Sequence, residues 1–218
     1  FGTGSPAIYS TANISVSNAI LNANNSEAVV VEGENSVTLT DCDVTGNMTG
    51  TYNDDEENIH NVMIYQSMSG DAEEGTAGFT MTGGSLTAKA GDMFYVTNTS
   101  CTIDLSQVAL TLANDKLFTI EGNSSSRGWG SEGANGGKVI CNTTKQALKG
   151  AITVDDISSL DLNMSENTTF EGTINTDGDA GEVNITMDSS STWTLTGDSY
   201  ITSFDGDLAN VITGEYTL

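Results

Sequence analysis

The feature that most constrains the fold is a repeat of short runs in which apolar and polar residues alternate. Residues 94–115 contain three such runs, at 94–96, 101–105 and 108–112, separated by Asn, Thr, Ser or Gln. Alternation with a period of two residues predicts β-strands, and the polar residues between them predict corners. This unit therefore predicts three strands joined by corners.

The same unit recurs along the chain. Three apolar positions repeat with spacings of 22, 23 and 24 residues, from Ile8 to Val30, from Ile14 to Val37 and from Ile20 to Val44. A repeat of this length built only from strands predicts coils that stack to bury a continuous inward row. We expect that row to contain Ile14, Val16, Val37, Leu39, Ile103, Leu105, Leu160 and Leu162.

The predicted fold class is all-β: a single-stranded parallel β-helix, or β-solenoid, with coils of about 22 residues and three short strands per coil. The competing prediction is a β-sandwich, because it also uses short alternating strands at regular spacing. Sandwich hairpins favour Asn-Gly and Asp-Gly turns, which begin here only at Asn135, Asp177 and Asp205. We expect a right-handed helix because parallel crossovers are nearly always right-handed.

We expect a single solenoid domain over residues 1–218, with loop excursions at 50–61, 70–76 and 121–137. The first two are rich in Asp and Glu, and the third contains the Gly/Ser-rich run 124–130. Repeat proteins accept such insertions at their corners. The chain opens without Met or a signal peptide and closes on an alternating run, so we expect the natural protein to be longer.

The charge balance excludes several classes of partner. Lys and Arg number 6 against 30 Asp and Glu, which gives a net charge of −24. A surface this acidic repels phosphate backbones and anionic membranes, so nucleic acid is not an expected partner. No stretch approaches the roughly 18 apolar residues of a membrane span. The composition suits an extracellular or cell-surface location.

Three cysteines, Cys42, Cys101 and Cys141, have no metal-binding spacing. At most one disulfide fits an odd number of cysteines. Whether one bridge or none forms, and between which residues, stays open from the sequence.

The coil spacing and the polar corners resemble those of the right-handed parallel β-helix proteins of bacterial and archaeal cell surfaces, an adhesin-like group related in fold to the pectate lyases. The resemblance covers nearly the whole chain and rests on the repeat. It implies a structural or adhesive role, with self-association or neighbouring surface proteins as partners. The open strand edges at the ends of a solenoid add end-to-end assembly into a filament to this expectation.

One segment, Asn-Thr-Asp-Gly at 175–178, is similar to a segment of the polygalacturonases. Those enzymes also need further carboxylates, a His and a basic pair. The single His60 and the single Arg127 lie elsewhere in the sequence, and six cations offer no cluster for a lyase base. We therefore expect no enzyme, and interpret Asp177 and Asp179 as corner residues beside Gly178.

Calcium is the only cofactor with candidate ligands. Acidic loops offer several oxygen ligands within a few residues, as a hard cation prefers. The candidates are Asp54, Asp55, Glu56, Asp177, Asp179 and Glu182, with a further acidic run at 71–74. The alternative is that these loops are simply solvated.

Carbohydrate enters the predictions in two ways. Nine Asn-x-Ser/Thr acceptors predict N-glycosylation at Asn13, Asn24, Asn47, Asn98, Asn123, Asn142, Asn163, Asn167 and Asn184. Trp129 beside Arg127 in a flexible loop is a candidate sugar contact, or else packs on a flank of the solenoid. The alternative function is therefore a carbohydrate-binding or degenerate polysaccharide-active β-helix. Thr-x-Thr pairs, such as Thr38 with Thr40, would suit ice binding only if they align over many coils.

Overall fold

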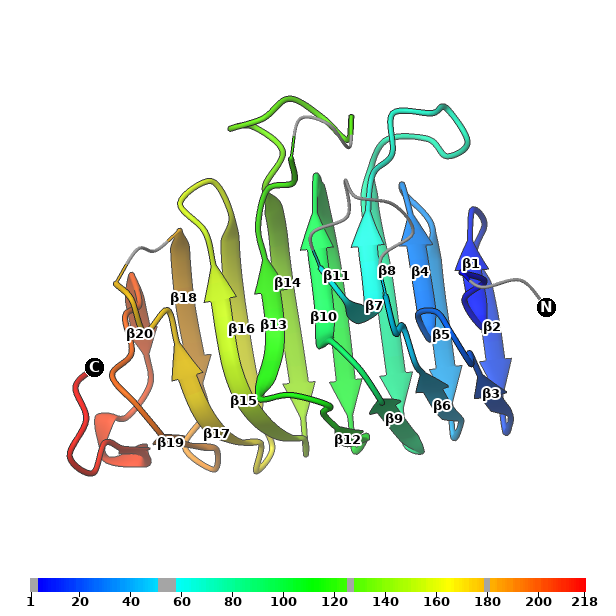
Figure 1. The fold of residues 1–218 in the computed structure, drawn as a ribbon. Coiled ribbons are helices and arrows are strands. Elements are labelled where there is room, and N and C mark those ends of the chain that lie inside the picture. The colour runs from blue at the N-terminus through cyan, green and yellow to red at the C-terminus, as the bar shows by residue number, and fades with distance from the viewer. Residues whose placement is uncertain (1–3, 51–57, 125–127, 179–180) are drawn as a thin grey trace.

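The computed structural model describes residues 4–50, 58–124, 128–178 and 181–218, which form a parallel β-helix (Figure 1). Every strand pair within the described residues is parallel, and the strands stack in chain order into three sheets of nine, eight and four strands. The predicted all-β solenoid is confirmed.

The nine-stranded first sheet runs the length of the stack. Its strands, in spatial order, are β1 (Ile8–Ser10), β4 (Val29–Glu32), β7 (His60–Tyr65), β10 (Asp92–Thr97), β13 (Lys116–Ile120), β15 (Ala147–Val154), β17 (Thr169–Ile174), β19 (Thr192–Leu195) and β21 (Val211–Ile212).

The other two sheets complete each coil. The second sheet contains β2 (Ile14–Ser17), β5 (Ser36–Thr40), β8 (Thr76–Thr82), β11 (Thr99–Ser106), β14 (Gly137–Thr144), β16 (Ser159–Ser165), β18 (Glu182–Met187) and β20 (Ser203–Asp205). The third contains β3 (Ile20–Asn22), β6 (Asp43–Gly46), β9 (Ser85–Ala88) and β12 (Ala109–Thr111), and a short 3-10 helix, η2 (Leu208–Asn210), precedes β21.

The register agrees with the predicted repeat at one position and differs by one residue at two. Ile14 pairs with Val37 as expected. Ile8 pairs with Val29, and Val44 pairs with Leu21. The prediction paired Ile8 with Val30 and Val44 with Ile20. Each predicted partner lies one residue from the observed partner in the sequence, and Ile20 is 76 % exposed. A slip of one residue exchanges the two faces of a strand, so the apolar residue chosen by spacing alone was the outward one.

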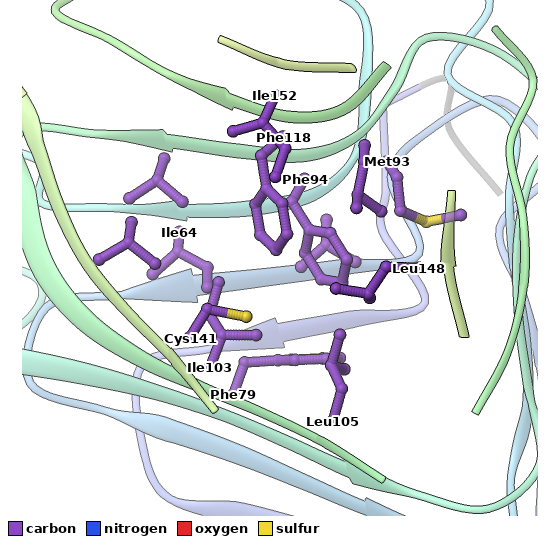
Figure 2. Close-up of a cluster of buried hydrophobic side chains, with 14 of the residues drawn as sticks. Ile64, Phe79, Met93, Phe94, Ile103, Leu105, Phe118, Cys141, Leu148 and Ile152 are labelled. Carbon is purple, nitrogen blue, oxygen red and sulfur yellow. The ribbon is translucent and has the colours of Figure 1, made fainter. Parts of the chain in front are cut away.

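The core contains the predicted inward row. Six of its eight members are fully buried, while Ile14 and Val16 are partly buried because β2 is the outermost strand of its sheet. Aromatic rings stack along the axis, with Phe94 and Phe118 at a centroid distance of 4.8 Å (Figure 2). Phe79 meets Phe94 edge-on at 5.8 Å. Stacking of this kind adds to the free energy gained from burial alone.

The cross-section changes after β12, where the third sheet ends. After β14 the chain enters the first sheet directly as the long strand β15, with no separate third-sheet strand before it. The chain passes from β16 to β17 in the same way. Gly150 has a φ of +111° and pairs with Gly172 in the next coil. The prediction of three strands per coil therefore describes the first four coils, and in later coils β15 and β17 run on from the third-sheet side into the first sheet.

The loop excursions start from two corners. Segment 66–75 joins β7 to β8 and segment 121–136 joins β13 to β14, so both lie where the chain passes from the first sheet to the second. Figure 1 shows them projecting from the same edge of the stack. We call this edge the first corner. Segment 47–59 instead joins the third sheet to the first, and its residues 51–57 lie outside the described part.

The three cysteines are free thiols, and all are buried. Cys101 pairs in register with Val139 and Cys141 with Ile103, so these two are diagonal neighbours on the inward face of the second sheet. Burial raises the pKa of Cys141 to about 12 and that of Cys101 higher still. The thiols of Cys101 and Cys141 are therefore protonated and unreactive at neutral pH.

Candidate functional site

A groove with a cavity volume of about 770 Å³ lies at the first corner, over the ends of β15 and β17. Consecutive coils contribute equivalent segments to it, because Ile152 pairs with Ile174. Its lining residues are Ala151, Ile152, Thr153, Val154, Asp155, Asp156, Thr173, Asn175, Thr176, Asp177 and Gly178. The groove therefore combines three carboxylates, three threonines and one amide.

On the side of the groove next to β15, Asp155 fixes the backbone. Its Oδ2 accepts a hydrogen bond from the Gly122 N–H at 2.7 Å, which ties the groove to the start of excursion 121–136. Its Oδ1 is buried and has no hydrogen-bond partner. Asp155 thus has one oxygen fixed by the backbone and one buried oxygen without a hydrogen bond.

On the side of the groove next to β17, Asn175 connects the two coils. The Asn175 Oδ1 accepts a hydrogen bond from the Val154 N–H at 2.7 Å, while Nδ2 is buried without a partner. Asn175 is 5 % exposed and has a φ of +48°. Asn tolerates this left-handed conformation better than most residues. The geometry places an unpaired amide donor in the wall of the groove.

The polygalacturonase-like segment forms a turn in this groove. The Gly178 N–H donates to the Asn175 carbonyl at 3.0 Å, and Gly178 has a φ of +79°. Asp177 is exposed at the tip of that turn, which agrees with its interpretation as a corner residue. Asp179 lies outside the described residues.

An aromatic ring stands at the rim. Tyr200 is 47 % exposed, and its N–H donates to the Ile174 carbonyl at 2.9 Å. A Cβ placed on Gly178 would lie 3.8 Å from the Tyr200 ring, so the ring lies directly beside the groove. An exposed ring next to polar groups is a typical platform for a sugar.

Trp129 lies in the excursion between β13 and β14 and is half-buried. It packs on Tyr65 at a centroid distance of 4.5 Å, against a cluster of outward side chains that contains Val30, Met63 and Tyr95. Its carbonyl accepts hydrogen bonds from the Nδ2 atoms of Asn123 and Asn135. This is the packing alternative, and Arg127 lies outside the described residues.

A smaller cavity of about 370 Å³ lies beside the Trp129 loop. Its walls come from the excursions 66–75 and 128–136 and from Asn98, and they include Met68, Glu74 and Ser131. Glu74 supplies the single carboxylate among its described lining residues, none of which is aromatic.

The glycosylation candidates differ in exposure. Asn13, Asn24 and Asn167 are exposed, Asn47, Asn98, Asn142, Asn163 and Asn184 are half-buried, and Asn123 is 9 % exposed. Asn123 donates two hydrogen bonds from Nδ2, to Thr97 Oγ1 and to the Trp129 carbonyl, so its nitrogen is the least accessible. Occupancy stays a prediction.

The calcium candidates do not converge in the described residues, which contain no group of three or more potential metal ligands. Asp177 lines the groove, while Glu182 is exposed and accepts a hydrogen bond from Asn184 at 3.1 Å. Asp54, Asp55, Glu56 and Asp179 lie outside the described part.

The threonine pairs align over only two coils. Thr38 and Thr40 lie beside Thr80 and Thr82 on the outer face of the second sheet. In the next coils Asp104, Asn142 and Asn163 take the equivalent position and hydrogen-bond one another at 2.8 and 2.9 Å. This polar ladder satisfies its own donors and does not present a regular threonine array.

His60 and Glu27 supply a pH-dependent contact away from the groove. His60 is 1 % exposed, and its Nε2 lies 3.4 Å from Glu27 Oε1. Burial alone raises the pKa of Glu27, but the contact with His60 and a hydrogen bond from Ser26 lower it below its ordinary value of 4.5. The contribution of Glu27 to the free energy of unfolding is thus complete above about pH 4.5 and declines as the pH falls through the lowered pKa.

We expect Glu27→Gln to weaken this pH dependence. The fall in melting temperature between about pH 6 and about pH 3 should be smaller in the variant than in the unmodified protein, because one group with a lowered pKa is removed. Glu215→Gln, at an exposed carboxylate, is the matched control. Equal falls in both variants would contradict the assignment.

No family model matches the chain, and no curated protein or solved structure is significantly similar to it. Within the described residues there is no helix of the length and hydropathy that a membrane span requires. The groove at the first corner is thus the feature on which a functional proposal rests.

Sequence reasoning identified the segment 175–178, with Asn175 and Asp177, and missed Asp155, Asp156 and Tyr200. A signal for the first pair was present, because Asp155 directly follows an apolar run and lies 22 residues before Asp177. A carboxylate repeated at the coil spacing predicts two acids side by side at one corner.

Proposed function

We propose that the protein is an extracellular adhesive β-solenoid, of the right-handed adhesin-like type related to pectate lyases, which binds glycans in the groove at the first corner. The observation that carries this proposal is the groove itself, with its three carboxylates, its unpaired amide and the Tyr200 ring at its rim. Convergent polar groups in a concave site are typical of ligand binding.

The rest of the molecule supports a structural role. The first sheet continues through nine strands, and a solenoid whose coils contact only their neighbours forms a stiff scaffold. In this proposal the solenoid holds the groove away from the surface that bears it. The exposed acceptors Asn13, Asn24 and Asn167 would carry glycans of the protein's own.

Self-association is part of the same proposal. Strands β1, β2 and β3 are the outermost members of their sheets, and unpaired strand edges favour pairing with another chain. Electron microscopy of concentrated protein would show filaments if the edges pair, and uniform monomers would contradict assembly.

A glycan array provides the direct test of binding. We expect Tyr200→Ala to lower the affinity for the bound glycan about tenfold, because ring stacking on a sugar contributes roughly 1–1.5 kcal/mol. Tyr216→Ala, at another partly exposed tyrosine, is the matched control. An array without binding, or equal affinities for the two variants, would overturn the proposal.

The second candidate function is polysaccharide cleavage. The observation that favours it is the presence of Asp155, Asp156 and Asp177 in one groove, since glycoside hydrolysis uses a pair of carboxylates. We favour binding because one oxygen of Asp155 is occupied by the Gly122 N–H and, among the described residues, no basic side chain lines the groove. Shortened oligosaccharides after incubation with the protein would favour cleavage.

A further inference from the structure

The charge of the groove restricts the ligand beyond the class of glycans. Asp155, Asp156 and Asp177 line it, and none of the lining residues that the structure describes is Lys, Arg or His. Glu121, one residue before the Gly122 that contacts Asp155, has a raised pKa because of burial and, in part, because of the Asp155 charge. The groove is therefore a region of negative potential on a chain whose net charge is −24.

Two buried atoms in the walls point to a ligand with both donors and acceptors. The Asp155 Oδ1 requires a donor, and the Asn175 Nδ2 requires an acceptor, yet neither has a partner in the folded chain. Buried polar atoms are paired in nearly all native structures, so an unpaired donor and acceptor in one groove indicate an external partner. Sugar hydroxyl groups supply both.

We propose that the groove binds a glycan whose sugars carry free, protonated amino groups, and that it rejects uronic-acid polymers. The amino groups donate to the carboxylates of Asp156 and Asp177, a ligand oxygen accepts from Asn175 Nδ2, and a sugar face packs on Tyr200. Hydrogen bonds between charged groups are stronger than neutral ones. This inference rests on the proposed function and adds the charge of the ligand to it.

The test compares three oligosaccharides of equal length by titration calorimetry at about pH 6. The probes are the hexamers of glucosamine, N-acetylglucosamine and galacturonic acid. We expect the glucosamine hexamer to bind at least about tenfold more tightly than the acetylated one, and galacturonate not to bind, because only the first places cations beside the carboxylates. Raising the salt from about 50 to about 500 mM should weaken glucosamine binding.

A pair of double variants separates the groove from the overall charge. Asp156→Asn with Asp177→Asn should reduce glucosamine affinity about tenfold or more. Asp205→Asn with Glu215→Gln makes the same change in net charge at exposed positions outside the groove and should leave the affinity unchanged. Equal losses in both double variants would overturn the inference.

The remaining outcomes distinguish the inference from the proposed function. Equal binding of the glucosamine and N-acetylglucosamine hexamers, sensitive to Tyr200→Ala, would overturn the charge preference and leave glycan binding intact. If neither the three hexamers nor any glycan on the array binds, both the inference and the proposed function are overturned. Equally tight binding of oligolysine would show that positive charge alone is recognised, which also overturns the inference.

Discussion

Replacing Phe118 with alanine is expected to lower the free energy of unfolding by about 3–5 kcal/mol. The Phe118 ring is fully buried and stacks on Phe94, with Leu148 and Ile152 also in the cluster (Figure 2). The core is closely packed from coil to coil, so the neighbouring side chains cannot move to fill the cavity left by the ring. Urea denaturation followed by circular dichroism measures the loss.

The control for this prediction is Ile140→Ala. Ile140 lies on β14 of the second sheet but points outward and is 45 % exposed, so its removal leaves no cavity. We expect a change below about 1 kcal/mol. If Phe118→Ala were no more destabilising than this control, the aromatic stack would not be the core of the molecule.

Replacing Gly172 with alanine is expected to cost about 3 kcal/mol, although it adds a single methyl group. A Cβ at Gly172 would lie 1.9 Å from the Gly150 carbonyl oxygen and 2.5 Å from the Phe170 ring. The first contact is with the backbone of the neighbouring coil, which cannot move away without breaking the pairing of β15 with β17. The midpoint of urea unfolding reports the effect.

Gly50→Ala is the matched control for this glycine. A Cβ at Gly50 has no atom within 4 Å, and its backbone does not require the left-handed region. We expect its unfolding midpoint to equal that of the unmodified protein. A tolerated Gly172→Ala would mean that the two coils are further apart than the structure places them.

The strand repeat could be predicted from the sequence because each apolar residue on the inward face is set by local alternation. The register was less predictable at the ends of the short strands. Val30 is apolar yet faces outward, where it contributes to the cluster around Tyr65, and Ile20 is exposed. Composition alone does not distinguish an outward apolar residue from an inward one, so spacing counted from such a residue is wrong by one.

The candidate site was less predictable than the fold because it is formed by residues that are distant in the sequence. Asp155 and Asp177 come together only when consecutive coils stack, and the segment containing Tyr200 is added by the coil after that. The sequence left two roles open for Trp129, a sugar contact or packing on a flank of the solenoid. Its packing on Tyr65 depends on how the excursion folds back, which no local pattern encodes.

The position of both excursions and the groove on the first corner has an evolutionary consequence. A coil added or lost elsewhere in the stack would leave every contact of the groove unchanged, because each coil contacts only its neighbours. The distance from the groove to either end of the stack would change by about 4.8 Å per coil. Selection can therefore adjust the reach of such a protein and the chemistry of its binding edge independently.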